Sequence, residues 1–225
     1  MALGSAASAE LRIVEFAPPH VAGVAAAHAN CFPGYFLTNL GADFLQMYYR
    51  ACLTEGAGFG VVALDASGGV HGFAVGVPDL DHQDAALLRR HPLRVTWAVA
   101  RAWVTDRQVR AQLAQRLRRM VRVVAGIVRH DIGAPDSAPV DVPFATLTSL
   151  AVLPGERRTG AASRLVSAFE RVAARRGFGV VRASTSMDDA VAVAFYLGNG
   201  WRIESERPSE RGVTFEKLLD VRDRR

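Results

Sequence analysis

The sequence contains a single lysine, Lys217, and all but one of its 27 basic residues are arginine. A Walker-type phosphate loop needs Gly-Lys-Ser/Thr, so this chain cannot form one. The Gly-x-Gly-x-x-Gly fingerprint of dinucleotide-binding proteins is also missing. Cysteine is scarce as well: Cys31 and Cys52 have no metal-ligand spacing, and they predict reduced thiols in a cytoplasmic protein.

Long apolar runs are absent too. No run reaches the 18 or more uncharged apolar residues of a membrane span, so we expect no stable insertion into a membrane. Residues 1–9 lack the basic start and apolar core of a signal peptide, and they predict a flexible tail. No cluster of His, Asp and Glu has metal-ligand spacing, and no aromatic platform accompanies the basic residues, so we expect neither a metal nor a nucleic-acid partner.

The chain has 225 residues, half of them apolar, which predicts one domain over 1–225. Hydrophobic periodicity and turn residues predict alternating strands and helices. The expected strands are 11–16, 59–64, 70–77, 143–153, 179–184, 201–205 and 213–219. The expected helices are 18–30, 41–54, 160–176 and 188–197.

A strand, a polar turn and an amphipathic helix follow one another between residues 144 and 176. The apolar run ends at Pro154, a turn with Arg157, Arg158 and Gly160 follows, and small residues open the helix. The first N–H groups of a helix have no partner within it, and the positive end of the helix dipole lies there. The turn therefore predicts a site for an anion such as a diphosphate. Gly160 and the alanines after it leave room for a ligand against the backbone.

This segment resembles the acyl-CoA-binding motif of the GNAT superfamily of N-acetyltransferases. In that family, Arg/Gln-x-x-Gly-x-Gly/Ala follows a strand that ends in Val-x-Pro. The matching residues here are Val152-Leu-Pro154 and Arg157-Arg-Thr-Gly-Ala-Ala162. The resemblance implies that the turn binds the diphosphate of CoA and that the end of the strand pairs with the pantetheine arm.

A second match lies downstream. GNAT chains often carry Asn-x-x-Ala-x-x-x-Tyr-x-x-x-Gly-Phe, and here Ala192, Tyr196 and Gly200 match, while Asp189 replaces Asn and Trp201 replaces Phe. A carboxylate cannot donate the hydrogen bond that an Asn donates, so the role of Asp189 differs at least in part. Together the two motifs assign the following residues to acyl-CoA binding: Leu150, Ala151, Val152, Arg157, Arg158, Thr159, Gly160, Ala161, Ala162, Ser163 and Asp189.

The resemblance implies an α/β fold, the GNAT fold. This is a mixed, mostly antiparallel, twisted sheet flanked by helices, with an acyl-CoA-binding core over 144–219. Acetyl-CoA would be the co-substrate. Tyr196 would be the general acid that protonates the CoA sulfur, and a backbone N–H near Leu150 would stabilise the thioester oxygen.

The general base is not evident. Many GNATs place a Glu on the fourth strand, where this chain has Thr146, and a hydroxyl is no base at neutral pH. Thr146, Thr148 and Ser149 are candidates to orient the acceptor or a water molecule. An ordered water chain is one alternative base, and other candidates follow the third strand: Asp79, Asp81 and His82.

Residues 82–131 form an insertion where a typical GNAT has a short loop. The insertion is rich in arginine and carries apolar residues at helical spacing: Leu113, Leu117, Met120, Val121, Val124, Ile127 and Val128. We expect a helix that packs on the sheet or on a partner subunit, as in a homodimer, and shapes the acceptor pocket. A basic amphipathic helix also characterises interfacial binding, so a membrane or nucleic-acid binder acting through 89–129 is an alternative.

Residues 31–45 contain Phe-Pro-x-x-Phe-Leu-x-x-Leu-Gly-x-x-Phe-Leu, which resembles bacterial GNATs associated with cell-surface polysaccharide clusters. In the family this loop lies over the acceptor cleft, so Phe32, Tyr35 and Phe36 would form an apolar or sugar-stacking wall. The sequence thus predicts acetyl transfer from acetyl-CoA to a primary amine of a small molecule, with an amino sugar first. The alternatives are a protein amine as acceptor, or a GNAT-fold sensor that binds acyl-CoA without catalysis.

Overall fold

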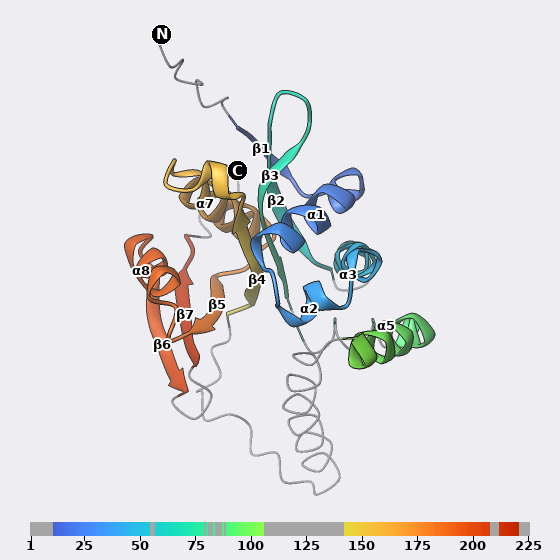
Figure 1. Cartoon of the computed structure of the whole chain (residues 1–225). Coiled ribbons are helices and arrows are strands. Elements are labelled where there is room, and N and C mark those ends of the chain that lie inside the picture. The colour runs from blue at the N-terminus through green and yellow to red at the C-terminus, as the bar shows by residue number, and fades with distance from the viewer. Residues whose placement is uncertain are drawn as a thin grey trace, which may run out of the picture.

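In the computed structural model, the chain forms a seven-stranded sheet with helices on both faces (Figure 1). The structure describes residues 11–54, 57–78, 80, 83, 87, 89–105, 142–207 and 212–220. The strand order is β1-β2-β3-β4-β5-β7-β6. Only β4 and β5 are parallel, and every other neighbouring pair is antiparallel. The predicted mixed, mostly antiparallel sheet of the GNAT fold is confirmed.

The elements follow the predicted alternation. The strands are β1 (Arg12–Glu15), β2 (Phe59–Leu64), β3 (Val70–Val77), β4 (Phe144–Val152), β5 (Val180–Ser186), β6 (Arg202–Arg207) and β7 (Gly212–Leu218). The helices are α1 (Val21–Cys31), α2 (Phe36–Asn39), α3 (Ala42–Thr54), α5 (Pro92–Thr105), α7 (Ala161–Arg175) and α8 (Ala190–Gly198), with 3-10 turns η1 (Pro18–His20) and η2 (Pro154–Glu156).

The β2–β3 hairpin is closed by its own turn chemistry. The Asp65 carboxylate accepts hydrogen bonds from the backbone N–H groups of Ser67 and Gly69, each at 2.8 Å. Gly68 has a φ of +86°, a conformation that glycine adopts without strain. Both strands begin and end at the predicted residues.

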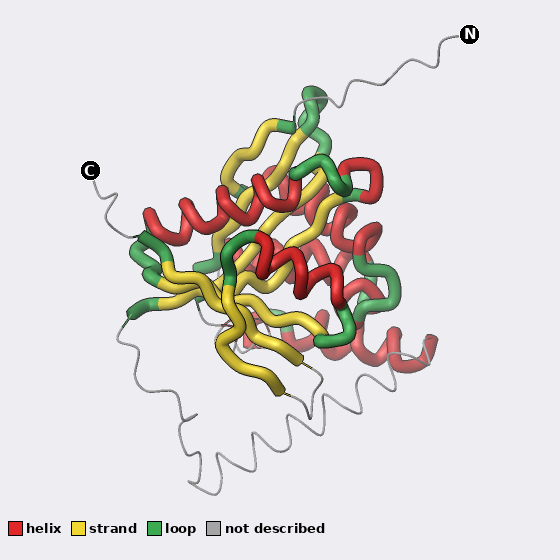
Figure 2. The backbone as a smooth tube through the Cα atoms, turned by 90° about the vertical axis from the view of Figure 1, so that its left-hand side faces the viewer, coloured by secondary structure: helices red, strands yellow, loops and turns green. Residues whose placement is uncertain are grey.

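Two hydrophobic cores lie on opposite faces of the sheet. Helices α1 and α3 cover one face, and α7 covers the other; seen from the α7 side, α7 and α8 lie in front of the strands (Figure 2). Gly76 in β3 permits the close approach of α7, because a Cβ there would lie 2.6 Å from the ring of Phe169. α7 is thus packed tightly against β3, the strand next to β4.

The structure departs from the predicted elements in two places near the N-terminus. The segment predicted as one helix over 18–30 consists of η1 followed by α1, because two consecutive prolines begin it. The four-residue α2 was not predicted, since it is too short to show a period.

Of the predicted insertion, α5 is described and contacts α3. Its apolar stripe from Leu113 to Val128 lies outside the described residues, as do residues 1–9. Among the described helices, none is long and apolar enough to span a membrane.

Glu170 of α7 joins the last turn of α8 to the sheet. Its carboxylate accepts a hydrogen bond from Trp201 Nε1 at 2.9 Å and forms an ion pair with Lys217 Nζ at 2.8 Å. Lys217 also donates to the carbonyl oxygen of Asn199 at 2.9 Å. Trp201 is buried, so its N–H depends on Glu170 for a partner.

We therefore expect Glu170→Ala to lower the free energy of unfolding by about 3 kcal/mol, because it leaves the buried Trp201 N–H without an acceptor and removes one of the two acceptors of Lys217. Urea denaturation followed by circular dichroism measures the change. The control is Arg175→Ala, which removes a pair with Glu15 whose side chains are 57% and 54% exposed. Its expected cost is below about 1 kcal/mol. Equal losses in the two variants would contradict this assignment.

Candidate active site

The candidate site lies where the parallel strands β4 and β5 separate. They pair from Phe144 opposite Val180 to Leu147 opposite Ala183. Beyond that point β4 continues along β3 as far as Val152, while β5 continues along β7. The divergence leaves the edge of β4 over 148–152 without a β5 partner, so its backbone groups face a cleft.

A β-bulge in β4 coincides with the divergence. Val75 lies opposite Ser149 and Gly76 opposite Leu147, so Thr148 is the extra residue. Its Oγ1 donates to the carbonyl oxygen of Val75 at 3.0 Å. A bulge shifts the alternation of side chains, so Leu147 and Leu150, three residues apart, both pack on the α7 core.

The N-terminus of α7 opens beside the end of β4. Gly160 is its N-cap with a φ of +83°, and no atom lies within 4 Å of the position that a Cβ would occupy. Glycine is therefore required here by the backbone conformation rather than by crowding. Arg157 Nε donates to the carbonyl oxygen of Val152 at 3.5 Å. Because the first turn of α7 contains no acidic residue, this end of the cleft favours an anion.

The cleft has a volume of about 430 Å³. Its walls come from the segment after α1, from β4 and its following turn, from β5 and from α7 and α8. The described residues that line it are Cys31, Phe32, Tyr35, Leu147, Thr148, Ser149, Leu150, Ala151, Val152, Arg157, Ala162, Ser184, Thr185, Asp189, Val191, Ala192, Phe195 and Tyr196.

Tyr196 reaches the cleft from the last turns of α8. Its ring stacks on Phe215 at 5.1 Å and contacts Trp201 at 5.2 Å, which fixes its orientation. No described residue forms a hydrogen bond with its hydroxyl. Burial, and secondarily the charge of Asp189, raise the pKa of Tyr196 to about 12. The phenol is therefore protonated at neutral pH and available as a donor in the cleft.

Asp189 is the one carboxylate among the described residues that line the cleft. Its Oδ1 accepts a hydrogen bond from the N–H of Ala192 at 3.0 Å, which makes it the N-cap of α8. It thus orients α8, which carries Tyr196, as well as lining the cleft.

The structure brings together most of the residues that the motifs indicate, but not all. Ser149 and the β4 residues 150–152 line the cleft with Arg157, Ala162 and Tyr196. Thr146 lies where β4 and β5 are still paired, so it does not line the cleft. Phe36 is also outside the lining, as are five residues of the turn and first helical positions: Arg158, Thr159, Gly160, Ala161 and Ser163. The candidate bases Asp79, Asp81 and His82 lie outside the described residues.

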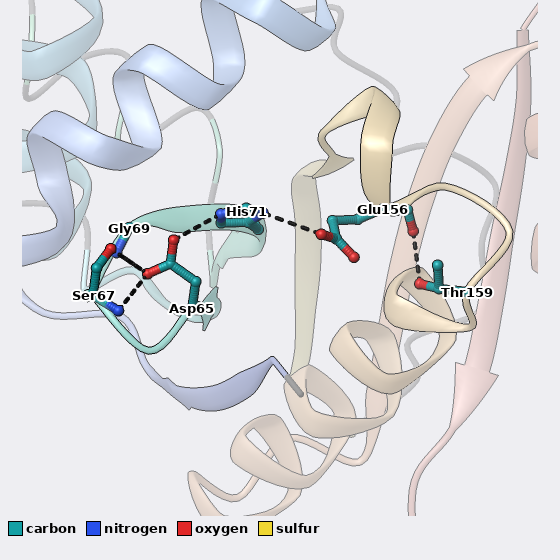
Figure 3. A network of polar contacts seen from close by, with 6 residues as sticks. All are labelled: Asp65, Ser67, Gly69, His71, Glu156 and Thr159. Carbon is teal, nitrogen blue, oxygen red and sulfur yellow. Dashed lines mark hydrogen bonds and ion pairs between the residues drawn. The ribbon is translucent and has the colours of Figure 1, made fainter. Parts of the chain in front are cut away.

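A polar network that the sequence did not indicate holds the turn before α7 (Figure 3). His71 of β3 lies between two carboxylates: its Nε2 is 3.0 Å from Asp65 Oδ2, and its Nδ1 is 3.3 Å from Glu156 Oε1. Hydrogen bonds, first from the Ser67 hydroxyl and then from the Gly69 N–H, lower the pKa of Asp65 to about 2. Thr159 Oγ1 donates to the Glu156 carbonyl at 2.7 Å. The hairpin thereby fixes the loop that leads to Arg157.

A second, larger cavity of about 1240 Å³ lies between α3 and α5. Its lining includes the exposed side chains of Leu93 and Trp97 and the arginines Arg50, Arg94 and Arg101. No residue of α5 lines the cleft at β4. The expectation that the insertion shapes the acceptor pocket stays a prediction, because most of the insertion lies outside the described residues.

Within the described ranges, no group of three or more His, Cys, Asp or Glu side chains is arranged to hold a metal ion. The chemistry available in the cleft consists instead of a protonated tyrosine, two hydroxyl-bearing β4 residues, unpaired strand edges and a helix N-terminus. That combination suits a ligand with a long polar arm and an anionic end.

Comparison with protein families agrees with this geometry. The acetyltransferase (GNAT) family model matches residues 98–201, which include β4, α7, β5 and α8. This segment, 104 of the 225 residues, is thus similar to GNAT acetyltransferases. The comparison with curated proteins found no match to this sequence.

Several solved structures share the fold at low sequence identity. Arylalkylamine N-acetyltransferase 2 from Aedes aegypti has a TM-score of 0.57 at 13% identity, over 93% of this chain and 99% of that one. YhbS from Escherichia coli, solved in complex with CoA, has a TM-score of 0.54 at 15% identity, over 98% and 89%. Ard1 from Thermoplasma volcanium has a TM-score of 0.53 at 17% identity, over 94% and 99%.

Proposed function

We propose that this protein transfers an acetyl group from acetyl-CoA to a primary amine of a small molecule, with an amino sugar as the first candidate. The observation that supports this most strongly is the cleft between the diverging strands β4 and β5. The cleft is closed at one end by the N-terminus of α7 and carries the protonated Tyr196 in its wall. The complex of YhbS with CoA supports CoA as the ligand of such a fold.

In this proposal the pantetheine arm pairs with the free edge of β4 at Leu150, Ala151 and Val152. The diphosphate lies at the first turn of α7, close to Arg157 and Ala162. The unpaired strand edge can form the hydrogen bonds of an added strand with the amides of the arm. The reacting thioester then lies toward the bulge, between Ser149 and Tyr196.

The amine attacks the thioester carbonyl directly, in a ternary complex. Its nitrogen forms a bond to the carbonyl carbon, the carbonyl oxygen becomes negatively charged, and a backbone N–H of β4 stabilises that charge. The carbon–sulfur bond then breaks, and Tyr196 gives its proton to the departing thiolate. The one carboxylate in the described lining caps α8, and in this proposal a water molecule receives the proton of the amine.

The acceptor would enter past Phe32 and Tyr35. Their rings are 5.2 Å apart, and Tyr35 is 59% exposed, so an aromatic face is available at the mouth of the cleft. Such a face packs well against the apolar side of a sugar ring. This supports an amino sugar over a protein amine, which would need a wider opening.

Acetyl-CoA should protect Cys31 from alkylation. Cys31 lines the cleft with its Sγ 3.4 Å from the Val152 carbonyl oxygen, whereas Cys52 is completely buried. Burial raises the pKa of Cys31, and the charge of Arg157 offsets this in part, so labelling is slow and is best done at mildly alkaline pH. Intact-mass spectrometry with iodoacetamide measures the rate as acetyl-CoA is added, and Cys31→Ser is the control for labelling elsewhere. An unchanged rate at about millimolar acetyl-CoA would mean that this cleft does not bind it.

The rate of thiol release from acetyl-CoA, measured with a panel of amines, then identifies the acceptor class. The panel contains glucosamine, tryptamine, free amino acids and a peptide with a free N-terminus and one lysine. Turnover with the amino sugar supports the proposal, and turnover with the peptide alone supports protein acetylation. Protection of Cys31 without turnover on any amine supports a sensor that binds acetyl-CoA without catalysis.

A further inference from the structure

His71, on β3, is held between two carboxylates that come from separate elements (Figure 3). Its Nε2 is 3.0 Å from Oδ2 of Asp65, in the turn before β3, and its Nδ1 is 3.3 Å from Oε1 of Glu156, in η2. A carboxylate offers only acceptors, so each nitrogen that faces one needs a proton, and only the imidazolium carries both. The charged ring thus ties the β2–β3 hairpin to η2.

The backbone of His71 makes a second connection to the same segment. Its carbonyl oxygen accepts a hydrogen bond from the N–H of Leu153 at 2.8 Å, and the Leu153 carbonyl oxygen accepts one from the N–H of Glu156 at 2.9 Å. The Glu156 carbonyl oxygen in turn accepts a hydrogen bond from Thr159 Oγ1 at 2.7 Å. A continuous series of contacts therefore runs from His71 through Glu156 into the turn that precedes α7.

The turn before α7 needs such support. Arg158 has a φ of +63°, a left-handed conformation that is unfavourable for a residue with a side chain, and Gly160 has a φ of +83°. An unfavourable backbone conformation persists only where the surrounding structure holds it. A turn that is fixed before binding also loses less conformational freedom when it takes up a ligand. Contacts that hold this turn should therefore contribute to the affinity for whatever binds at the N-terminus of α7.

We propose that His71 is a positioning residue for acyl-CoA: its contact with Glu156 holds the turn over 157–160 in the conformation that receives the diphosphate. His71 is not among the described residues that line the cleft, so it acts on the ligand through the turn. Binding of the nucleotide half of acetyl-CoA depends on this contact, whereas binding of the acetylated pantetheine half does not. This inference rests on the proposed binding of acetyl-CoA in the cleft.

Two substitutions separate the two contacts of the ring. The amide nitrogen of Asn is three bonds from Cα, as is Nδ1 of histidine, and the amide nitrogen of Gln is four bonds away, as is Nε2. His71→Asn therefore keeps a donor toward Glu156, whereas His71→Gln keeps one toward Asp65. The concentration of acetyl-CoA that halves the rate of Cys31 alkylation should rise about fivefold in His71→Gln and stay within about twofold in His71→Asn. The expected loss is modest because the His71 side chain is 29% exposed.

S-acetylpantetheine, which lacks the diphosphate and the nucleotide, is the matched probe. Its half-protecting concentration should be the same in the wild-type protein and in both variants, because β4 rather than the turn binds it. A merely structural role of His71 would weaken both ligands, so a loss with S-acetylpantetheine would overturn the proposal, as would equal losses of acetyl-CoA affinity in the two variants. Absence of protection by acetyl-CoA in the wild-type protein would refute the proposed function itself, whereas wild-type protection that is unchanged in His71→Gln refutes only this inference.

Discussion

Replacing Ala162 with glutamate should weaken acetyl-CoA binding by about 100-fold or more. Ala162 is at the second position of α7 and lines the cleft. A carboxylate there would occupy the space of the diphosphate and repel its charge. The same substitution should not harm folding, because an acidic side chain in the first turn of a helix interacts favourably with the dipole. Isothermal titration calorimetry measures the affinity.

The matched control is Ala174→Glu, in the last turn of the same helix, which does not line the cleft. An acidic residue at a helix C-terminus is unfavourable, so this variant should be the less stable of the two. It should still bind acetyl-CoA with wild-type affinity. Wild-type affinity in Ala162→Glu would place the diphosphate somewhere other than the N-terminus of α7.

Tyr196→Phe should lower kcat about 100-fold while leaving the acetyl-CoA affinity nearly unchanged. The ring packing on Phe215 and Trp201 is retained in the variant, and the hydroxyl makes no hydrogen bond to another described residue. Structure and binding should therefore persist, and only the proton donor is lost. Thiol release and calorimetry on the same preparation separate the two effects.

Tyr48→Phe provides the comparison, since Tyr48 is a buried tyrosine that does not line the cleft. Because the Tyr196 pKa is raised to about 12, kcat should not fall between pH 6 and 9 through loss of this proton. An unchanged kcat in Tyr196→Phe would remove this residue from the mechanism and leave thiolate protonation to water.

Local patterns in the sequence predict most of the fold. Strands β2 and β3 begin and end at the predicted residues because their pairing depends on a turn that is encoded locally, between Asp65 and Gly69. α7 also matches closely, since its apolar face follows the helical period over four turns. α2 was missed because four residues cannot display a period, and η1 was merged with α1 because a 3-10 turn and a helix share their start signals.

The candidate site was predictable only where one continuous segment forms it. The end of β4, the turn at Arg157 and α8 with Tyr196 were found from two motifs. The buried hydrogen bond between His28 Nδ1 and Tyr49 Oη at 2.6 Å joins two helices, and nothing near His28 in the sequence distinguishes it from any other buried histidine. His71 was missed for the same reason, because both of its carboxylate partners are brought to it by the pairing of separate elements.

The pairing of Lys217 with Glu170 bears on how acetylation by this protein would be measured. An amine attacks a thioester only when its nitrogen can reach the carbonyl carbon, and Lys217 Nζ is held by the Glu170 carboxylate at 2.8 Å and by the Asn199 carbonyl oxygen at 2.9 Å. The only lysine of the chain is thus a poor target for acetyl-CoA, whether by the protein's own activity or by uncatalysed transfer. Self-modification on lysine is therefore disfavoured, so acetyl-lysine that appears in a reaction marks an added acceptor.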